Sequence, residues 1–232
     1  DAQPVPDLQS LRNELFRTSG GVKPRVGSPT SPSAAPNSEG MAPLKTAVPI
    51  ALQPLANEAR MAFEAGRFDE AVGKFRQILS SQPTNLFALS NLGVVYFQQG
   101  KLPEAEQSLL KALDVEPRDS FSLSILGLVY YRQGDFPKAS DCLDRSLKLD
   151  AHNARTHNYH GITLAQQGKI NEALGELQRA VEINPDYGEA HYNLALLYAA
   201  IGPSEKKQVA HHYRLARALG LPPDPRIEEA VR

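Results

Sequence analysis

Residues 86–119 read LFALSNLGVVYFQQGKLPEAEQSLLKALDVEPRD, and this stretch decides the fold of the chain. When the sequence is shifted by 34 residues, Gly93 falls on Gly127, and a second shift brings it to Gly161. A fixed period of this length is typical of helix-turn-helix units that stack into an array. The period predicts five such units, over residues 52–85, 86–119, 120–153, 154–187 and 188–224.

Each unit contains two helical patterns that meet at a glycine. Gly66, Gly100, Gly134 and Gly168 occupy this turn, where glycine adopts the left-handed conformation of a helix C-cap without steric cost. Small residues in the first helix, such as Gly93, should let neighbouring helices approach closely. The residues expected near the start of the second helix are Asp69, Pro103, Pro137 and Asn171, whose types favour a cap or a first turn.

The composition limits the classes of function. The 232 residues include 25 basic and 26 acidic side chains and no long basic run, so we expect no nucleic-acid partner. Cys142 is the only cysteine, which excludes an intrachain disulfide, and no apolar run approaches the ~20 residues of a membrane span. Because the sequence begins with Asp1, we expect a processed or cut chain. The localisation that this favours is extracytoplasmic or secreted after signal-peptide removal, with the cytoplasm as the alternative.

Two segments precede the repeats. Residues 1–17 place Leu8, Leu11, Leu15 and Phe16 at spacings that predict a short amphipathic helix, an arm that needs another surface to lie against. Residues 18–49 are rich in Pro, Ser and Gly and predict a flexible linker that would span roughly 30 Å. The arm can therefore reach the repeats of its own chain or those of a second copy.

The repeat pattern resembles the tetratricopeptide repeat family over about 170 of the 232 residues. The match rests on leucine, small, tyrosine, alanine and proline columns, represented in residues 86–119 by Leu89, Gly93, Tyr96, Ala105 and Pro117. The resemblance implies an all-α fold, a right-handed α-solenoid of about five helix-turn-helix repeats over residues 50–224, preceded by the Pro/Ser/Gly-rich arm. It also implies that the first helices line a concave groove and that the protein binds other proteins.

One face of the first helices predicts where a partner binds. At about 100° per residue, Leu89, Leu92 and Tyr96 share one face of their helix, and Phe87 and Val94 lie roughly opposite, where a surface helix would be polar. The same face in the other repeats extends an apolar stripe, composed of Phe87, Val94, Phe97, Phe121, Leu128, Tyr131, Ile162, Tyr192 and Leu196. We expect this stripe to bind an apolar or amphipathic segment, with packing against second helices as the alternative.

Chemistry at a metal or catalytic site is not expected. His157, His160 and His191 are close enough in the repeat pattern to suggest a metal site, but no carboxylate or thiol completes a ligand set at helical spacing. They occupy core columns, so we interpret them as hydrogen-bonded packing residues. Nothing orients a base toward Cys142, and each repeated glycine is explained by a turn or a close helix contact. The sequence therefore predicts a protein that is not an enzyme and that needs no cofactor or metal.

The C-terminal end favours a second hypothesis. Residues 225–232 form a short tail that is just long enough to begin one more helix, so we expect the polar capping helix that solenoids usually need to be incomplete. An under-covered end and an apolar arm favour contact with another copy, and a head-to-tail contact that does not close builds a filament. The first hypothesis is thus a non-enzymatic protein-protein interaction scaffold, and the alternative is a self-assembling subunit, an oligomer or filament in which the arm docks on a neighbouring copy.

Overall fold

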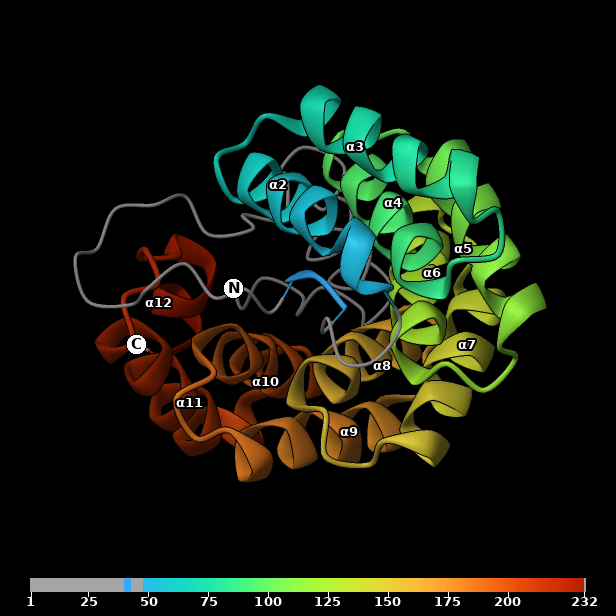
Figure 1. Cartoon of the computed structure of the whole chain (residues 1–232). Helices are drawn as coiled ribbons and strands as arrows, with labels where there is room; N and C mark the ends of the chain where they lie inside the picture. Colours follow the sequence, from blue (N-terminus) through green and yellow to red (C-terminus); the bar gives the residue numbers. More distant parts are fainter. Residues whose placement is uncertain (1–39, 43–47, 232) are drawn as a thin grey trace. The chain divides into compact units, whose positions relative to one another are not determined.

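The computed structural model describes residues 40–42 and 48–231, which fall into two compact units divided between Ala151 and His152. In the first unit, three helix pairs follow a short 3-10 turn, η3 (Ile50–Leu52). Figure 1 shows α2 beside α3, α4 beside α5 and α6 beside α7. Their bounds are α2 (Gln53–Glu64), α3 (Phe68–Ser81), α4 (Leu86–Gln98), α5 (Leu102–Val115), α6 (Ser120–Gln133) and α7 (Phe136–Leu149).

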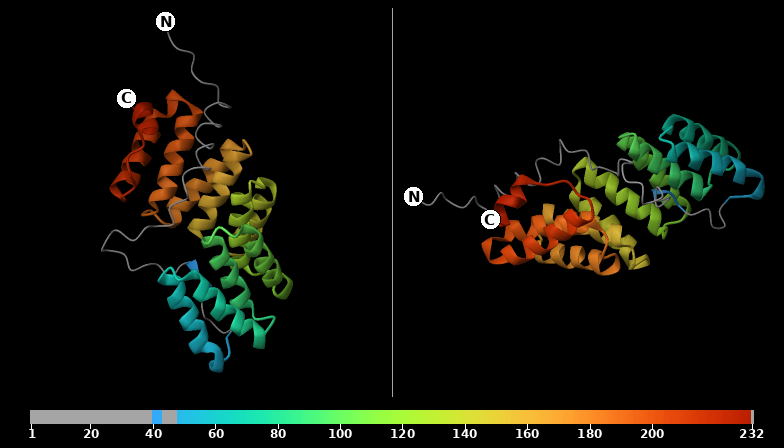
Figure 2. Two further views of the ribbon diagram at one scale, coloured as in Figure 1. Left: turned by 90° about the horizontal axis from the view of Figure 1, so that it is seen from above. Right: turned by 90° about the vertical axis from the view of Figure 1, so that its left-hand side faces the viewer.

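The second unit contains two further pairs and a closing helix, which the additional views separate more clearly (Figure 2). A 3-10 turn, η4 (Pro203–Glu205), accommodates the additional residues of the last repeat. The helices are α8 (Ala154–Gln166), α9 (Ile170–Ile183), α10 (Gly188–Ile201), α11 (Lys206–Ala218) and α12 (Pro225–Val231). Every element in the described ranges is helical, so the predicted all-α architecture of stacked helix pairs is confirmed.

Local chemistry sets the helix ends. The turn glycines have the expected left-handed backbone, with φ of +75° at Gly100 and +82° at Gly134. The first helices begin at side-chain caps: Asn85 accepts a hydrogen bond from the amide of Ala88, and Asp119 and Asn153 play the same role for α6 and α8. Asp69, in contrast, lies inside the first turn of α3, so the polar residue predicted near this start is not its N-cap.

Close approach between the two helices of a pair depends on the glycine of the first helix. A Cβ atom added at Gly93 would lie 2.6 Å from Cγ of Leu109, and one at Gly127 would lie 2.6 Å from Cγ of Leu143. Both leucines are fully buried. The second helix of each pair therefore fills the volume that a larger residue on the first helix would need, which explains the repetition of these glycines.

Tyrosine side chains connect one repeat to the second helix of the repeat before it. Each is largely buried, and its hydroxyl group forms a hydrogen bond with a polar side chain of that preceding helix. The bonded pairs are Arg76 with Tyr96, Glu106 with Tyr130 and Gln178 with Tyr198. Burial and the neighbouring Glu106 carboxylate raise the pKa of Tyr130 to about 12, so this hydroxyl remains a donor at neutral pH. These links hold consecutive repeats together within each unit.

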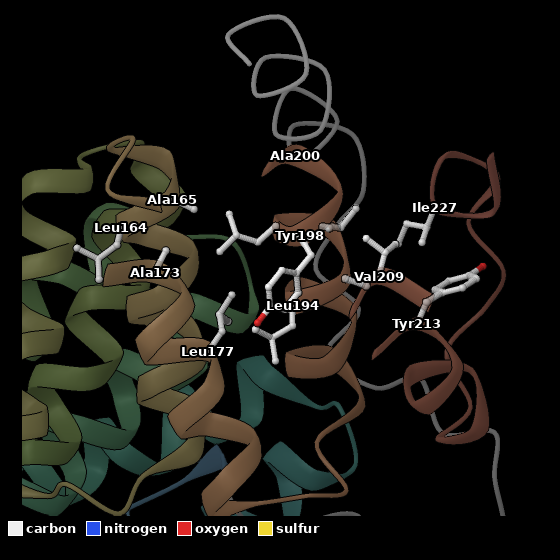
Figure 3. Packing of buried hydrophobic residues seen from close by; sticks show 13 residues of the cluster. Leu164, Ala165, Ala173, Leu177, Leu194, Tyr198, Ala200, Val209, Tyr213 and Ile227 are labelled. Carbon is white, nitrogen blue, oxygen red and sulfur yellow. The ribbon is translucent and has the colours of Figure 1, made fainter. Parts of the chain in front are cut away.

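The end of the last repeat is covered. Ile227 of α12 is 1% exposed and packs with Val209 and Tyr213 of α11 (Figure 3). The expectation of an under-covered C-terminal end is therefore wrong for the described residues, because the short helix that residues 225–232 allow does form and covers this end. Most of the predicted linker, residues 18–49, lies outside the described residues, and within the described part Met41 and Val48 are each 7% exposed.

The glycine contacts predict opposite effects for two substitutions within the α8–α9 pair. At Gly161, a Cβ atom would lie 2.7 Å from Cγ of Leu177 and 3.1 Å from the carbonyl oxygen of Ala173, so Gly161→Ala should destabilise the fold by about 1–3 kcal/mol. At Gly175, in the middle of α9, nothing lies within 4 Å, and Gly175→Ala should stabilise the fold by about 0.5–1 kcal/mol. Urea unfolding followed by circular dichroism measures both, and equal effects would contradict the packing argument.

Candidate functional site

Helix α4, the first helix of the second repeat, is covered by neighbouring helices. It contacts α3 of the preceding repeat, α5 of its own repeat and α6 of the following one. The rings of Phe87 and Phe75 meet edge to face with centroids 6.0 Å apart, and the hydroxyl groups of Ser90 and Ser122 form a 2.7 Å hydrogen bond. Three sides of the helix are therefore packed against other helices, and every residue from Phe87 to Phe97 is buried.

The nine residues of the predicted apolar stripe differ in burial. Five of the nine side chains lie in the core, in line with the alternative that they pack against other helices. These five are Phe87, Val94, Phe97, Leu128 and Leu196, whereas Phe121, Tyr131, Ile162 and Tyr192 are half-buried. A first helix packs against second helices on both sides, so an apolar face opposite its own partner helix is not automatically a free surface. Whether the half-buried residues bind a partner stays a prediction.

Arginine and aromatic contacts hold two of the stripe residues in the first unit. The guanidinium group of Arg132 lies over the ring of Phe97, 5.3 Å from its centroid. Tyr131 packs against Phe136 of α7 with ring centroids 5.7 Å apart. Tyr131 and Phe121 are both only half-buried and both belong to α6. These two rings are the part of the stripe in the first unit that a partner could contact without opening the core.

A polar residue that the sequence analysis missed lies beside the stripe on α4. Asn91 is fully buried, and its Nδ2 donates to the carbonyl oxygen of Phe87 at 2.8 Å. Its Oδ1 accepts a 2.7 Å hydrogen bond from the backbone amide of Ala42, in the segment that precedes the repeats. At about 100° per residue, Asn91 shares a face with Phe87 and Val94, a spacing that could have singled it out as the one polar group there.

The second unit has a related polar contact on its first helices. Asn193 is three periods of 34 residues from Asn91, and its Nδ2 donates to Oδ1 of Asn158 at 2.8 Å. Asn158 in turn donates to the hydroxyl of Tyr187 at 3.4 Å. Burial, with a smaller contribution from nearby Tyr159, raises the pKa of Tyr187 well above its usual value. The side chains of both asparagines are thus turned toward each other in this unit.

The first two histidines of the suggested metal site share a carboxylate. Oε2 of Glu176 lies 2.6 Å from Nδ1 of His157 and 3.5 Å from Nδ1 of His160. Burial opposes ionisation of Glu176, but hydrogen bonds from both histidines outweigh it and lower its pKa to about 2. The charge of this half-buried carboxylate is therefore retained at neutral pH, and sequence spacing did not reveal it because Glu176 lies on α9.

His191 lies apart from that group and pairs with His212 of α11. Its Nε2 lies 2.9 Å from the carbonyl oxygen of Pro185, which can only accept, so Nε2 carries a proton. In neutral His191, Nδ1 then accepts from Nδ1 of His212 across 3.0 Å. The ring of His212 also stacks on Tyr198. Burial and the neighbouring His191 and His211 lower the pKa of His212 to about 4.

A charged cluster links α10, the first helix of the last repeat, to α12. Asp224 accepts hydrogen bonds from the hydroxyl of Tyr192 at 2.6 Å and from the guanidinium group of Arg226. The bond from Arg226 is the main cause that lowers the pKa of Asp224 to about 2, against the effect of burial. The backbone amide of Asp224 donates to the hydroxyl of Tyr213 at 2.7 Å. Tyr192, predicted as a partner-binding residue, thus has a structural role within its own chain.

Reactive groups and metal clusters are scarce in the described parts of the chain. Burial raises the pKa of Cys142 to about 11, so its thiol is protonated at neutral pH and is a poor nucleophile. Residues 40–42 and 48–231 hold no group of three or more His, Cys, Asp or Glu side chains arranged to hold a metal ion. Across the same residues, every helix is too short or too polar to cross a bilayer.

Comparisons with known proteins agree with this architecture. Models of the tetratricopeptide repeat match residues 52–73 and 85–152, and a TPR repeat model matches residues 161–202. A crystal structure of MamA superimposes with a TM-score of 0.61 at 21% identity, covering 69% of this chain and 93% of that one. MamA from Desulfovibrio magneticus RS-1 gives 0.64 at 16% identity, covering 74% and 96%. YrrB, a TPR protein with an unusual peptide-binding site, gives 0.60 at 21% identity, covering 76% and 90%.

These matches define the class of the protein. The chain belongs to the tetratricopeptide repeat family, and its fold is that of the solved TPR proteins MamA and YrrB. Members of this family are typically interaction modules without enzymatic activity. None of the curated proteins compared with the sequence matches it. At this level, the fold and the family support a scaffold for protein interactions.

The histidine pair predicts a pH dependence of stability. The pKa of His212 is about 4 in the folded state against an ordinary value of 6.5, so folding keeps the ring neutral. Its contribution to stability is complete above about pH 6.5 and is lost as the pH falls towards 4, because only the unfolded chain then gains the proton. Each pH unit in this interval should change the unfolding constant by up to about tenfold.

His212→Phe provides the matched comparison. The phenyl ring can keep the stacking on Tyr198 but cannot ionise. Urea unfolding at pH 7.5, 6.5, 5.5 and 4.5 should show a smaller loss of stability in the variant than in the wild type. Parallel pH profiles for the two proteins would show that His212 does not carry this effect.

Proposed function

We propose that the protein is a scaffold whose first helices in residues 48–151 bind an extended or amphipathic segment of a partner protein. The observation that carries the proposal is the hydrogen bond between Asn91 and the backbone amide of Ala42. It supports the idea that the side of α4 that carries Asn91 accepts a segment of chain through a backbone contact. The half-buried rings of Phe121 and Tyr131 on α6 supply the apolar contacts that such a segment needs.

A photo-cross-linking experiment can identify the partner and the surface together. A photoreactive phenylalanine analogue replaces Phe121 in one bait and Gln107, an exposed residue of the second helix α5, in a control bait. We expect position 121 to yield cross-linked peptides from a defined partner segment and position 107 to yield none from that segment. Equal cross-linking at both positions would argue against binding on the first helices.

Substitution then measures the contribution of the two rings. Phe121→Ala combined with Tyr131→Ala should weaken binding of the identified segment by about tenfold or more, because aromatic anchors supply much of the affinity of such contacts. Leu110→Ala is the matched control, since Leu110 is an apolar residue of α5 that is 43% exposed. Isothermal titration calorimetry measures both, and circular dichroism checks that the helices remain. An unchanged affinity in the double variant would contradict the proposal.

A second proposal, self-assembly, is supported by a different observation. The C-terminal end is covered by α12, but the first repeat leaves Ile50 83% exposed and Met61 61% exposed. Ile50 belongs to η3, which contacts α2, the helix that carries Met61. We infer that, if copies associate, the arm residues Leu8, Leu11, Leu15 and Phe16 of one copy contact this end of the next. The arm lies outside the described residues, and export of the protein likewise stays a prediction.

Particle size tests the second proposal. Ile50→Glu combined with Met61→Glu should convert large particles into monomers, because charged side chains oppose burial of this surface. Deletion of residues 1–39 should have the same effect, since it removes the arm and keeps the segment that contacts Asn91. Light scattering coupled to size-exclusion chromatography measures the mass. A monomeric wild type, or variants with unchanged mass, would rule out this mode of assembly.

A further inference from the structure

The residues just before the repeats lie on the first unit. Met41 is 7% exposed although no helix contains it, and a Cβ atom on Gly40 would be 3.4 Å from Cε1 of Phe63 in α2. Ala42 donates its backbone amide to Asn91 of α4. The three residues 40–42 therefore touch the first helices of two consecutive repeats. The sequence alone gave no sign of this, because the segment is rich in Pro, Ser and Gly.

Another chain segment can take the place of residues 40–42 in the contact with Asn91. Asn91 uses its Nδ2 on the carbonyl oxygen of its own helix, which fixes the carboxamide so that Oδ1 faces the amide of Ala42. That bond recognises a backbone group, not a particular side chain. If residues 40–42 leave, a fully buried acceptor loses its partner, which favours binding of another backbone amide at the same place.

We propose that residues 40–42 are an intramolecular occupant of the partner-binding surface, and that a partner segment must displace them. This inference rests on the proposed function, because it assigns the side of α4 that carries Asn91 to both segments. Only residues 43–52 separate the segment from α2, so its effective concentration at Asn91 is in the millimolar range or above. A single hydrogen bond changes an equilibrium by only about fivefold, so the contact reduces the affinity for a partner without abolishing it.

The first test asks whether the site is occupied in the full chain. Hydrogen exchange of the Ala42 amide, followed by NMR, should be slowed relative to an unstructured amide in the wild type. Asn91→Ala should remove this protection, and Ala42→Ser, which keeps the amide, should retain it. Exchange of the wild-type Ala42 amide at the rate of an unstructured chain would overturn the proposal, whatever partner the protein binds.

The second test asks whether displacement limits binding. The probe is a fluorescein-labelled peptide of residues 37–46, NSEGMAPLKT, titrated into the full chain and followed by anisotropy. Ala42→Pro deletes the donor of the internal contact but leaves Asn91 intact, so this variant should bind the peptide about three to ten times more tightly than the wild type. Ala42→Ser should match the wild type, and Asn91→Ala should weaken binding even when combined with Ala42→Pro.

The outcomes separate this proposal from the proposed function. Equal affinity of the wild type and Ala42→Pro, or absence of peptide binding to both, would overturn intramolecular occupancy at this site. Neither result bears on Phe121 and Tyr131, whose role the cross-linking and calorimetry experiments decide. Conversely, a protected Ala42 amide and tighter binding by Ala42→Pro would support the internal occupant even if the two aromatic rings proved irrelevant. Because Ala42 lies outside the helices, its substitution leaves the repeats intact.

Discussion

In three of the five helix pairs, a leucine of the second helix occupies the space that a side chain on the first helix would otherwise fill, and this contact sets the geometry of those pairs. Where Gly127 faces Leu143, a methyl group would lie 2.6 Å from Cγ of the leucine and 3.3 Å from the carbonyl oxygen of Ala139. Alanine therefore cannot replace this glycine unless the leucine side chain or the helix backbone shifts. The same contact recurs in three successive pairs, so the two helices of these pairs approach each other equally closely.

The close packing of the two helices in a pair determines which surface of α4 remains for binding a partner. Once α4 is packed against its own second helix, it also meets α3 and α6, and most of its side chains become core. On the side that carries Phe87 and Val94, the buried Asn91 accepts a hydrogen bond from the backbone amide of Ala42. A face with so few polar groups recognises backbone and apolar surface. This is consistent with a scaffold that binds segments of other chains, or its own, and not with a reactive site.

The sequence predicted the helices well and the surface poorly, for a physical reason. Period and turn chemistry are local, so the repeat length and the turn glycines predict the five helix pairs that the structure contains. Periodicity identifies the face that carries Phe87, but it does not show that Phe75 of the previous repeat covers that face. The sequence allowed a short helix at residues 225–232 but did not show that it covers the last repeat, because Asp224 acquires its role only through Tyr192, 32 positions earlier.

The glycine–leucine contact between paired helices can be tested most directly by NMR. The measurement is the nuclear Overhauser effect between leucine methyl groups and glycine Hα protons, in a methyl-labelled, otherwise deuterated chain with protonated glycine. The account predicts strong cross-peaks from the methyl groups of Leu109, Leu143 and Leu177 to Gly93, Gly127 and Gly161, respectively. Such peaks require the close approach of the paired helices, which buries residues Phe87 to Phe97 of α4. Absence of these cross-peaks in a folded, helical sample would contradict the account.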